Sequence, residues 1–86
     1  MATFSANQYT VSTVPVQVAA QKLGRLELVI TNLGVTPVYL GNSSVTYTTG
    51  QLLPGIVGAS FVTSTHANVF AVVAVGSQSI AVSESS

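Results

Sequence analysis

Charged side chains are almost absent from this chain of 86 residues. Lys22, Arg25, Glu27 and Glu84 are the only four, which is 5% of the sequence, and the formal net charge is zero. An ordinary soluble domain carries about 25% charged residues. Because there are so few charges, copies of the chain repel each other only weakly. We therefore expect the free monomer to associate and much of its surface to form interfaces.

The chain is also short, and it contains no cysteine. A chain of this length forms one domain with a modest core, and small domains are often stabilised by a disulfide, a metal or a partner subunit. Disulfides are excluded here, and structural zinc needs several thiolate or imidazole ligands, of which His66 is the one candidate. We therefore expect no cofactor and a homo-oligomer as the stabilising arrangement.

The same composition excludes several kinds of function. Two basic residues cannot form the patch with which nucleic-acid binders neutralise phosphates. The longest apolar run, Val69–Val75, is far shorter than the roughly 20 residues of a membrane-spanning helix. Residues 1–10 lack the basic start and apolar centre of a secretory signal, so synthesis in the cytoplasm is expected, with neither nucleic acid nor membrane as a partner.

An active site is equally hard to assemble from these side chains. Aspartate is absent, and a serine triad would require Glu27 or Glu84 to come close to His66. We therefore predict a non-enzymatic protein without catalytic, cofactor-binding or metal-binding residues. Candidate contacts with a partner are Phe4 and Tyr9, in the amino-terminal segment, and His66, for which the simpler interpretation is a surface histidine bonded to nearby backbone.

Short runs of valine, threonine, isoleucine and aromatic residues, separated by Gly, Asn, Pro and Ser, predict an all-β fold. In Arg25–Asn32 the side chains of Leu26, Leu28 and Ile30 share one face, whereas Val69–Val75 is apolar on both faces like a central strand. The spacing of the runs is typical of a small antiparallel β-sandwich or barrel of about seven strands. The predicted strands are Val11–Ala20, Arg25–Asn32, Pro37–Gly41, Val45–Thr48, Ile56–Thr63, Val69–Val75 and Ser79–Ser83.

Three of these strands carry finer predictions. Pro15 cannot donate a backbone hydrogen bond, so the first strand should lie at a sheet edge or be broken there. Pro37–Gly41 and Val45–Thr48 should pair as a hairpin, in which Tyr39 and Tyr47 either pack across the strands or line a sugar-binding face.

The ends of the chain differ from its middle. Residues 1–86 are expected to form a single β domain, with residues 1–10 as an amino-terminal arm and residues 84–86 as a short polar tail. The arm would either fray or anchor on a neighbouring subunit. Lys22 and Arg25, on either side of Gly24, would either keep a turn solvated or face an acidic patch on a partner.

The order of strands and turns from Arg25 onward resembles that of small virion proteins and head-fibre segments of tailed bacteriophages. The resemblance rests on Arg25, Ile30-Thr31-Asn32, Gly34, Pro37-Val38-Tyr39-Leu40-Gly41, Val45-Thr46, Gly50, Leu53-Pro54-Gly55, Phe70–Ala74 and Ile80–Val82. It implies a β module on the capsid surface, often a homotrimer, that binds the major capsid protein and stabilises the assembled shell as a decoration protein. Relatives usually carry acidic residues in the segment that corresponds to Ser64–Asn68, which has none here, so their acidic contact surface is not transferred.

Three alternatives remain open. A phage tail or baseplate component would use the same kind of β module. A carbohydrate-binding adhesion module would stack Tyr39 or Tyr47 on sugar rings, although the lack of Trp and Asp weakens it. A fibre or pilus-like subunit is suggested by the uncharged Val69–Val75, although the full set of turns favours a closed globular unit.

Overall fold

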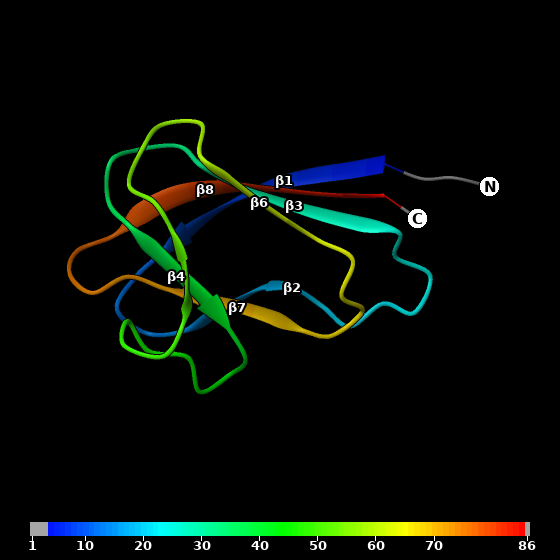
Figure 1. Cartoon of the computed structure of the whole chain (residues 1–86), viewed down its shortest axis with the longest axis horizontal. Coiled ribbons are helices and arrows are strands. Elements are labelled where there is room, and N and C mark those ends of the chain that lie inside the picture. Colours follow the sequence, from blue (N-terminus) through cyan, green and yellow to red (C-terminus); the bar gives the residue numbers. More distant parts are fainter. Residues whose placement is uncertain (1–3, 86) are drawn as a thin grey trace.

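Two four-stranded antiparallel sheets pack face to face in the computed structural model, which describes residues 4–85 (Figure 1). The strand order is β1-β8-β3-β6 in one sheet and β2-β7-β4-β5 in the other, which is the arrangement of an eight-stranded jelly roll. The strands are β1 (Phe4–Val11), β2 (Val16–Ala19), β3 (Glu27–Asn32), β4 (Val38–Gly41), β5 (Gln51–Leu53), β6 (Ser60–Thr63), β7 (Val69–Val72) and β8 (Gln78–Ser85). The prediction of an all-β antiparallel sandwich is confirmed.

The core lies between the two sheets and follows the predicted alternation in β3. Leu28 and Ile30 are both 0% exposed and face the core, whereas Val29 and Thr31 between them are only half-buried. Leu26 was predicted to share the buried face, but it is 68% exposed. The reason is that β3 begins only at Glu27, so Leu26 precedes the strand and its side chain does not follow the alternation.

The central position predicted for Val69–Val75 is confirmed for Val69–Val72, whereas residues 73–75 lie in the following loop. This strand, β7, lies between β2 and β4 in its sheet, and Ala71 and Val72 are both buried although they point to opposite faces. The interruption at Pro15 is confirmed as well. β1 ends at Val11, and β2 begins at Val16 and forms an edge of the other sheet.

The strand count differs from the prediction in the middle of the chain. Residues 45–48 lie in a loop instead of a strand, so the predicted hairpin is wrong in its second half. β4 pairs instead with β5, from Val38 opposite Leu53 to Leu40 opposite Gln51. The next predicted strand is shortened to Ser60–Thr63, because Gly58, at a φ of 89°, belongs to the preceding loop.

The ends of the described chain are strands rather than loose segments. Phe4–Val11 pairs with β8 along its whole length, from Phe4 opposite Ser85 to Val11 opposite Gln78. Glu84 and Ser85, predicted to be a polar tail, pair with both β1 and β3. The arm and tail are therefore part of the sandwich wherever they are described, while residues 1–3 and 86 lie outside the described residues.

The topology gives the sandwich two different ends (Figure 1). The loops of residues 12–15, 33–37, 54–59 and 73–77 gather at one end, drawn on the left, which we call the loop end. The loops of residues 20–26 and 64–68 lie at the opposite end together with the start of β1 and the end of β8. We call this the terminal end. No helix in residues 4–85 is long and apolar enough to cross a membrane.

Candidate functional site

All four charged residues lie at the terminal end of the sandwich. Lys22 and Arg25 belong to the loop of residues 20–26, Glu27 begins β3, and Glu84 is near the end of β8. The imidazole of His66 is at the same end, in the loop that precedes β7. The loop end contains no charged residue, so the charged side chains are confined to one end of the molecule.

Large apolar side chains are exposed at both ends, including Phe4, Leu23 and Leu26 at the terminal end, but at the loop end they have no charged residue among them. The five most exposed apolar residues of the loop end are each between 65% and 75% accessible: Val14, Val35, Ile56, Val57 and Val75. At least one comes from each of the four loops. Exposed apolar groups that gather without intervening charges mark surfaces that bind another molecule. The loop end is therefore the candidate functional site, and strand patterning could not reveal it because its residues come from four separate turns.

Asn32 fixes the shape of the loop end. Its side chain is 0% exposed, and its Nδ2 donates to the carbonyl oxygens of Thr36 at 2.8 Å and Pro54 at 3.0 Å. Its Oδ1 accepts a hydrogen bond from the backbone N–H of Gly34 at 2.9 Å. One buried amide thus joins the loops that carry Val35, Ile56 and Val57.

Two further contacts hold the same loops in place. The Oε1 of Gln78 accepts a hydrogen bond from the backbone N–H of Thr36 at 3.1 Å, which ties the loop of residues 33–37 to β8. A Cβ atom at Gly55 would collide with the backbone carbonyl of Val35, so the two loops approach too closely for any side chain there. Val35, Ile56 and Val57 are therefore displayed on loops that these contacts hold in a defined conformation.

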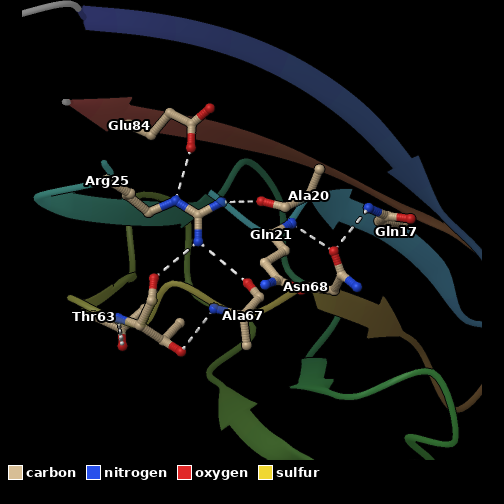
Figure 2. A network of polar contacts seen from close by, with 9 residues as sticks. Gln17, Ala20, Gln21, Arg25, Thr63, Ala67, Asn68 and Glu84 are labelled. Atoms are coloured by element: carbon tan, nitrogen blue, oxygen red, sulfur yellow. Dashed lines mark hydrogen bonds and ion pairs between the residues drawn. The ribbon is translucent and has the colours of Figure 1, made fainter. Parts of the chain in front are cut away.

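The polar network at the terminal end is structural (Figure 2). The Arg25 side chain is 0% exposed, and its Nε forms an ion pair with the Oε2 of Glu84 at 2.8 Å. Its two terminal nitrogens donate to the carbonyl oxygens of Thr65 at 2.9 Å, Ala67 at 3.2 Å and Ala20. The prediction that Arg25 keeps a turn solvated or faces an acidic patch on a partner is therefore wrong, because its buried guanidinium forms hydrogen bonds within the chain.

Asn68 extends this network toward β2. Its Oδ1 accepts from the backbone N–H of Gln21 and from the Nε2 of Gln17 at 3.4 Å (Figure 2). Together with Arg25 it joins the loops of residues 20–26 and 64–68, while Lys22 remains exposed. The terminal end is thus fastened by internal hydrogen bonds.

None of the three predicted partner contacts belongs to the four loops of the loop end. Phe4 is 74% exposed at the start of β1, and His66 is exposed in its loop, where its carbonyl oxygen accepts from the N–H of Lys22 at 2.9 Å. Tyr9 is half-buried and packs against the core. Phe4 and Tyr9 point to opposite faces of β1, since their positions differ by an odd number, so the structure does not bring these residues together into one site.

Tyr39 and Tyr47 form an edge-to-face pair. Their ring centroids are 6.5 Å apart and the ring planes are inclined by 63°. The predicted aromatic packing is present, although Tyr47 lies in the loop of residues 42–50. Rings arranged edge to face do not form a flat platform for a sugar ring. Beside Tyr47 lies an open groove of about 400 Å³, lined also by Val45 and Val73.

No family model matches the chain, and a search of curated proteins found no match. Among solved structures the chain is similar to a Bacillus endospore appendage protein, from a family described as disulfide-linked pili. The TM-score is 0.58 at 14% sequence identity, and the match covers 99% of this chain and 85% of the other. Within residues 4–85 no three His, Cys, Asp or Glu side chains gather as metal ligands would. At this level of identity, the likeness identifies the fold that both chains share.

Proposed function

We propose that this chain is a non-enzymatic structural module that docks its loop end onto a larger protein assembly. The observation that carries the proposal is the loop end itself, with its five exposed apolar side chains, its lack of charge and its fixed conformation. Burying such a surface against an uncharged protein surface is favourable and requires no desolvation of charges. Because the loops are already ordered, little conformational entropy is lost on docking.

More specifically, we propose that the chain is a decoration protein of a bacteriophage capsid. This proposal is supported by the resemblance of the segment from Arg25 to Gly55 to small phage virion proteins and by the jelly-roll fold, which recurs in viral capsid domains. Fold alone does not determine function, so the resemblance provides the specific part of this argument. In this arrangement the loop end contacts the major capsid protein, and the terminal end, with Lys22 and Glu27, faces the solvent.

A second candidate is a subunit of a surface fibre. It is favoured by the structural likeness to the endospore appendage protein, which belongs to a family of disulfide-linked pili. The 86 residues of this chain contain no cysteine, so any contacts that these residues make between copies would be non-covalent. The loop end would then bind the next subunit along the fibre instead of a shell.

Location in the source organism tests both candidates. We expect antibodies raised against the purified chain, in immunogold electron microscopy, to label the heads of virus particles. Labelling of cell-surface filaments would favour the fibre subunit, and labelling confined to phage tails would contradict the capsid assignment. A diffuse cytoplasmic distribution, with no label on any assembly, would contradict the structural role itself.

A further inference from the structure

The two sheets present four edge strands, and three of them are poor partners for another strand. β2 has four residues, follows Pro15, and is irregular in register between Gln17 and Ala19. β5 has three residues and is followed by Pro54, and β6 has four residues. Short strands, bulges and neighbouring prolines are the features that prevent edge strands from pairing with other chains.

β1 has none of these protective features. It is eight residues long, contains no charged residue, proline or glycine, and pairs with β8 in an unbroken register. Its other edge has no partner strand in the order β1-β8-β3-β6, and Phe4–Gln8 are exposed. A long, regular and uncharged edge strand is a template on which an additional strand can form backbone hydrogen bonds.

We propose that β1 pairs with β1 of a second copy of this chain, antiparallel and around a two-fold axis. An antiparallel pair of identical strands is self-complementary, so one surface serves both partners and the assembly closes at two copies. The lack of charge in β1 means that no like charges oppose each other at this contact. The alternative edge of a second copy, β6, would match only four of the eight residues.

The pairing joins two four-stranded sheets into one sheet of eight strands across two copies. It also supplies the partner subunit that a small domain without disulfides benefits from. The resemblance to phage proteins implies a trimer, whereas pairing through one self-complementary edge implies a dimer. The proposal concerns β1 alone and does not depend on what the loop end binds.

Like charges placed at the centre of β1 test this geometry. Ala6 and Gln8 are exposed and point away from the core, since Tyr9 packs against it, and both lie near the middle of the strand. In an antiparallel pair centred on Asn7, Ala6 of one copy lies opposite Gln8 of the other, so the introduced charges oppose each other directly. We therefore expect Ala6→Lys/Gln8→Lys, and separately Ala6→Glu/Gln8→Glu, to raise the dimer dissociation constant about tenfold or more. Mixing the two variants should restore the dimer.

Native mass spectrometry and sedimentation equilibrium would measure these dissociation constants. The control is Ser43→Lys/Gln51→Lys, which adds the same two charges at exposed positions away from β1 and should leave the dimer unchanged. Circular dichroism spectra should show the same β fold for all variants. A monomeric or trimeric wild-type chain, a lysine variant that still dimerises, or a mixture that does not recover would each overturn the proposal. A variant with a changed loop end, Ile56→Asp/Val57→Asp, that no longer docks but still dimerises would confirm that the two surfaces are separate.

Discussion

Arg25 and Asn32 are the two buried polar side chains of the described chain, and each joins loops that are distant in sequence. Arg25 connects the loops of residues 20–26 and 64–68 to β8, whereas Asn32 connects the loops of residues 33–37 and 54–59. All buried side-chain nitrogen and oxygen atoms in residues 4–85 have hydrogen-bond partners. Removing either side chain would therefore leave buried partners unsatisfied, which costs more than the net contribution of an ordinary hydrogen bond.

Arg25→Met should destabilise the fold strongly. The substitution removes the ion pair with Glu84 and leaves carbonyl groups that Arg25 had satisfied, so we expect a loss on the order of 3 kcal/mol in the free energy of unfolding. Urea unfolding followed by circular dichroism measures this loss. Arg25→Lys should recover little of it, because an ammonium group cannot reproduce the planar fork that reaches several acceptors. The exposed Lys22→Met is the control, and an equal effect of both substitutions would contradict the structural role of Arg25.

Asn32→Asp should be destabilising although it barely changes the shape of the side chain. Asn32 donates through Nδ2 to two carbonyl oxygens, and a carboxylate would place negative charge against both acceptors. We expect a loss of about 1–3 kcal/mol or more, measured by urea unfolding at neutral pH. Asn42→Asp is the matched control. Its Oδ1 only accepts, from the N–H of Ser44 at 2.9 Å, so the acid retains that contact and stability should change little.

At the scale of elements, the strands with strong alternation were predictable from the sequence and the weakly patterned strands were not. β3 and β7 show their alternation or apolar character directly, because the sheet buries their side chains against the core. Only half of the residues of β1 are apolar, most of its residues are exposed, and β5 has only three residues. What makes these segments strands is backbone pairing with β8 and with β4, which no local pattern of side chains encodes.

The boundary of β3 can be tested with two substitutions on the face that the alternation predicts. Ile30→Ala should lower the free energy of unfolding by about 2–5 kcal/mol, because Ile30 is fully buried and a cavity would remain. Leu26→Ala should cost less than about 0.5 kcal/mol, because Leu26 is 68% exposed before the strand begins. Thermal and urea unfolding would compare the two variants. Similar losses for both would show that Leu26 belongs to the core after all.

At the scale of the whole molecule, the main feature is that all four charged residues lie at the terminal end, whereas the exposed apolar side chains of the loop end have no charged residue among them. The two ends arise because consecutive strands run in opposite directions, so alternate loops gather at the same end of the sandwich. The two ends offer different chemistry to a partner, and the edge strand β1 lies along the side between them. Docking and self-pairing can therefore occur on the same molecule without competing for one surface.

Ile56→Asp/Val57→Asp should abolish docking without affecting the fold. Both side chains are about two-thirds exposed, at 65% and 67%, so the isolated chain should keep its melting temperature. Affinity for the assembly should fall about a hundredfold or more, since each buried apolar side chain contributes about 1.5–3 kcal/mol and a buried unpaired charge is unfavourable. Co-sedimentation with the assembly that immunogold labelling identifies would measure this affinity.

Leu23→Asp/Leu26→Asp is the matched control at the terminal end. Leu23 and Leu26 are 78% and 68% exposed, so the double variant loses the same kind of surface and gains the same charge. We expect its binding to the assembly to be unchanged. If this variant lost binding while Ile56→Asp/Val57→Asp bound normally, the docking surface would lie at the terminal end and the proposal would be wrong.

The sequence by itself determined the fold class, and it predicts a single domain with little capacity for acid-base or nucleic-acid chemistry. These follow from local alternation, from turn residues and from a count of charges, none of which requires knowledge of long-range contacts. The resemblance to phage proteins, carried by turns and strands, added a proposal about function that the fold alone does not test.

Only the tertiary structure decided which residues meet. Arg25 looks like a surface charge in the sequence, yet it is buried because two distant segments, β8 and the loop of residues 64–68, converge on it. Val14, Val35, Ile56 and Val75 are scattered over the chain, and the jelly-roll topology places their loops at one end. The physical reason is that strand pairing in a jelly roll joins residues far apart in sequence, so convergence of loops and exposure of edges are set by topology and not by neighbouring residues.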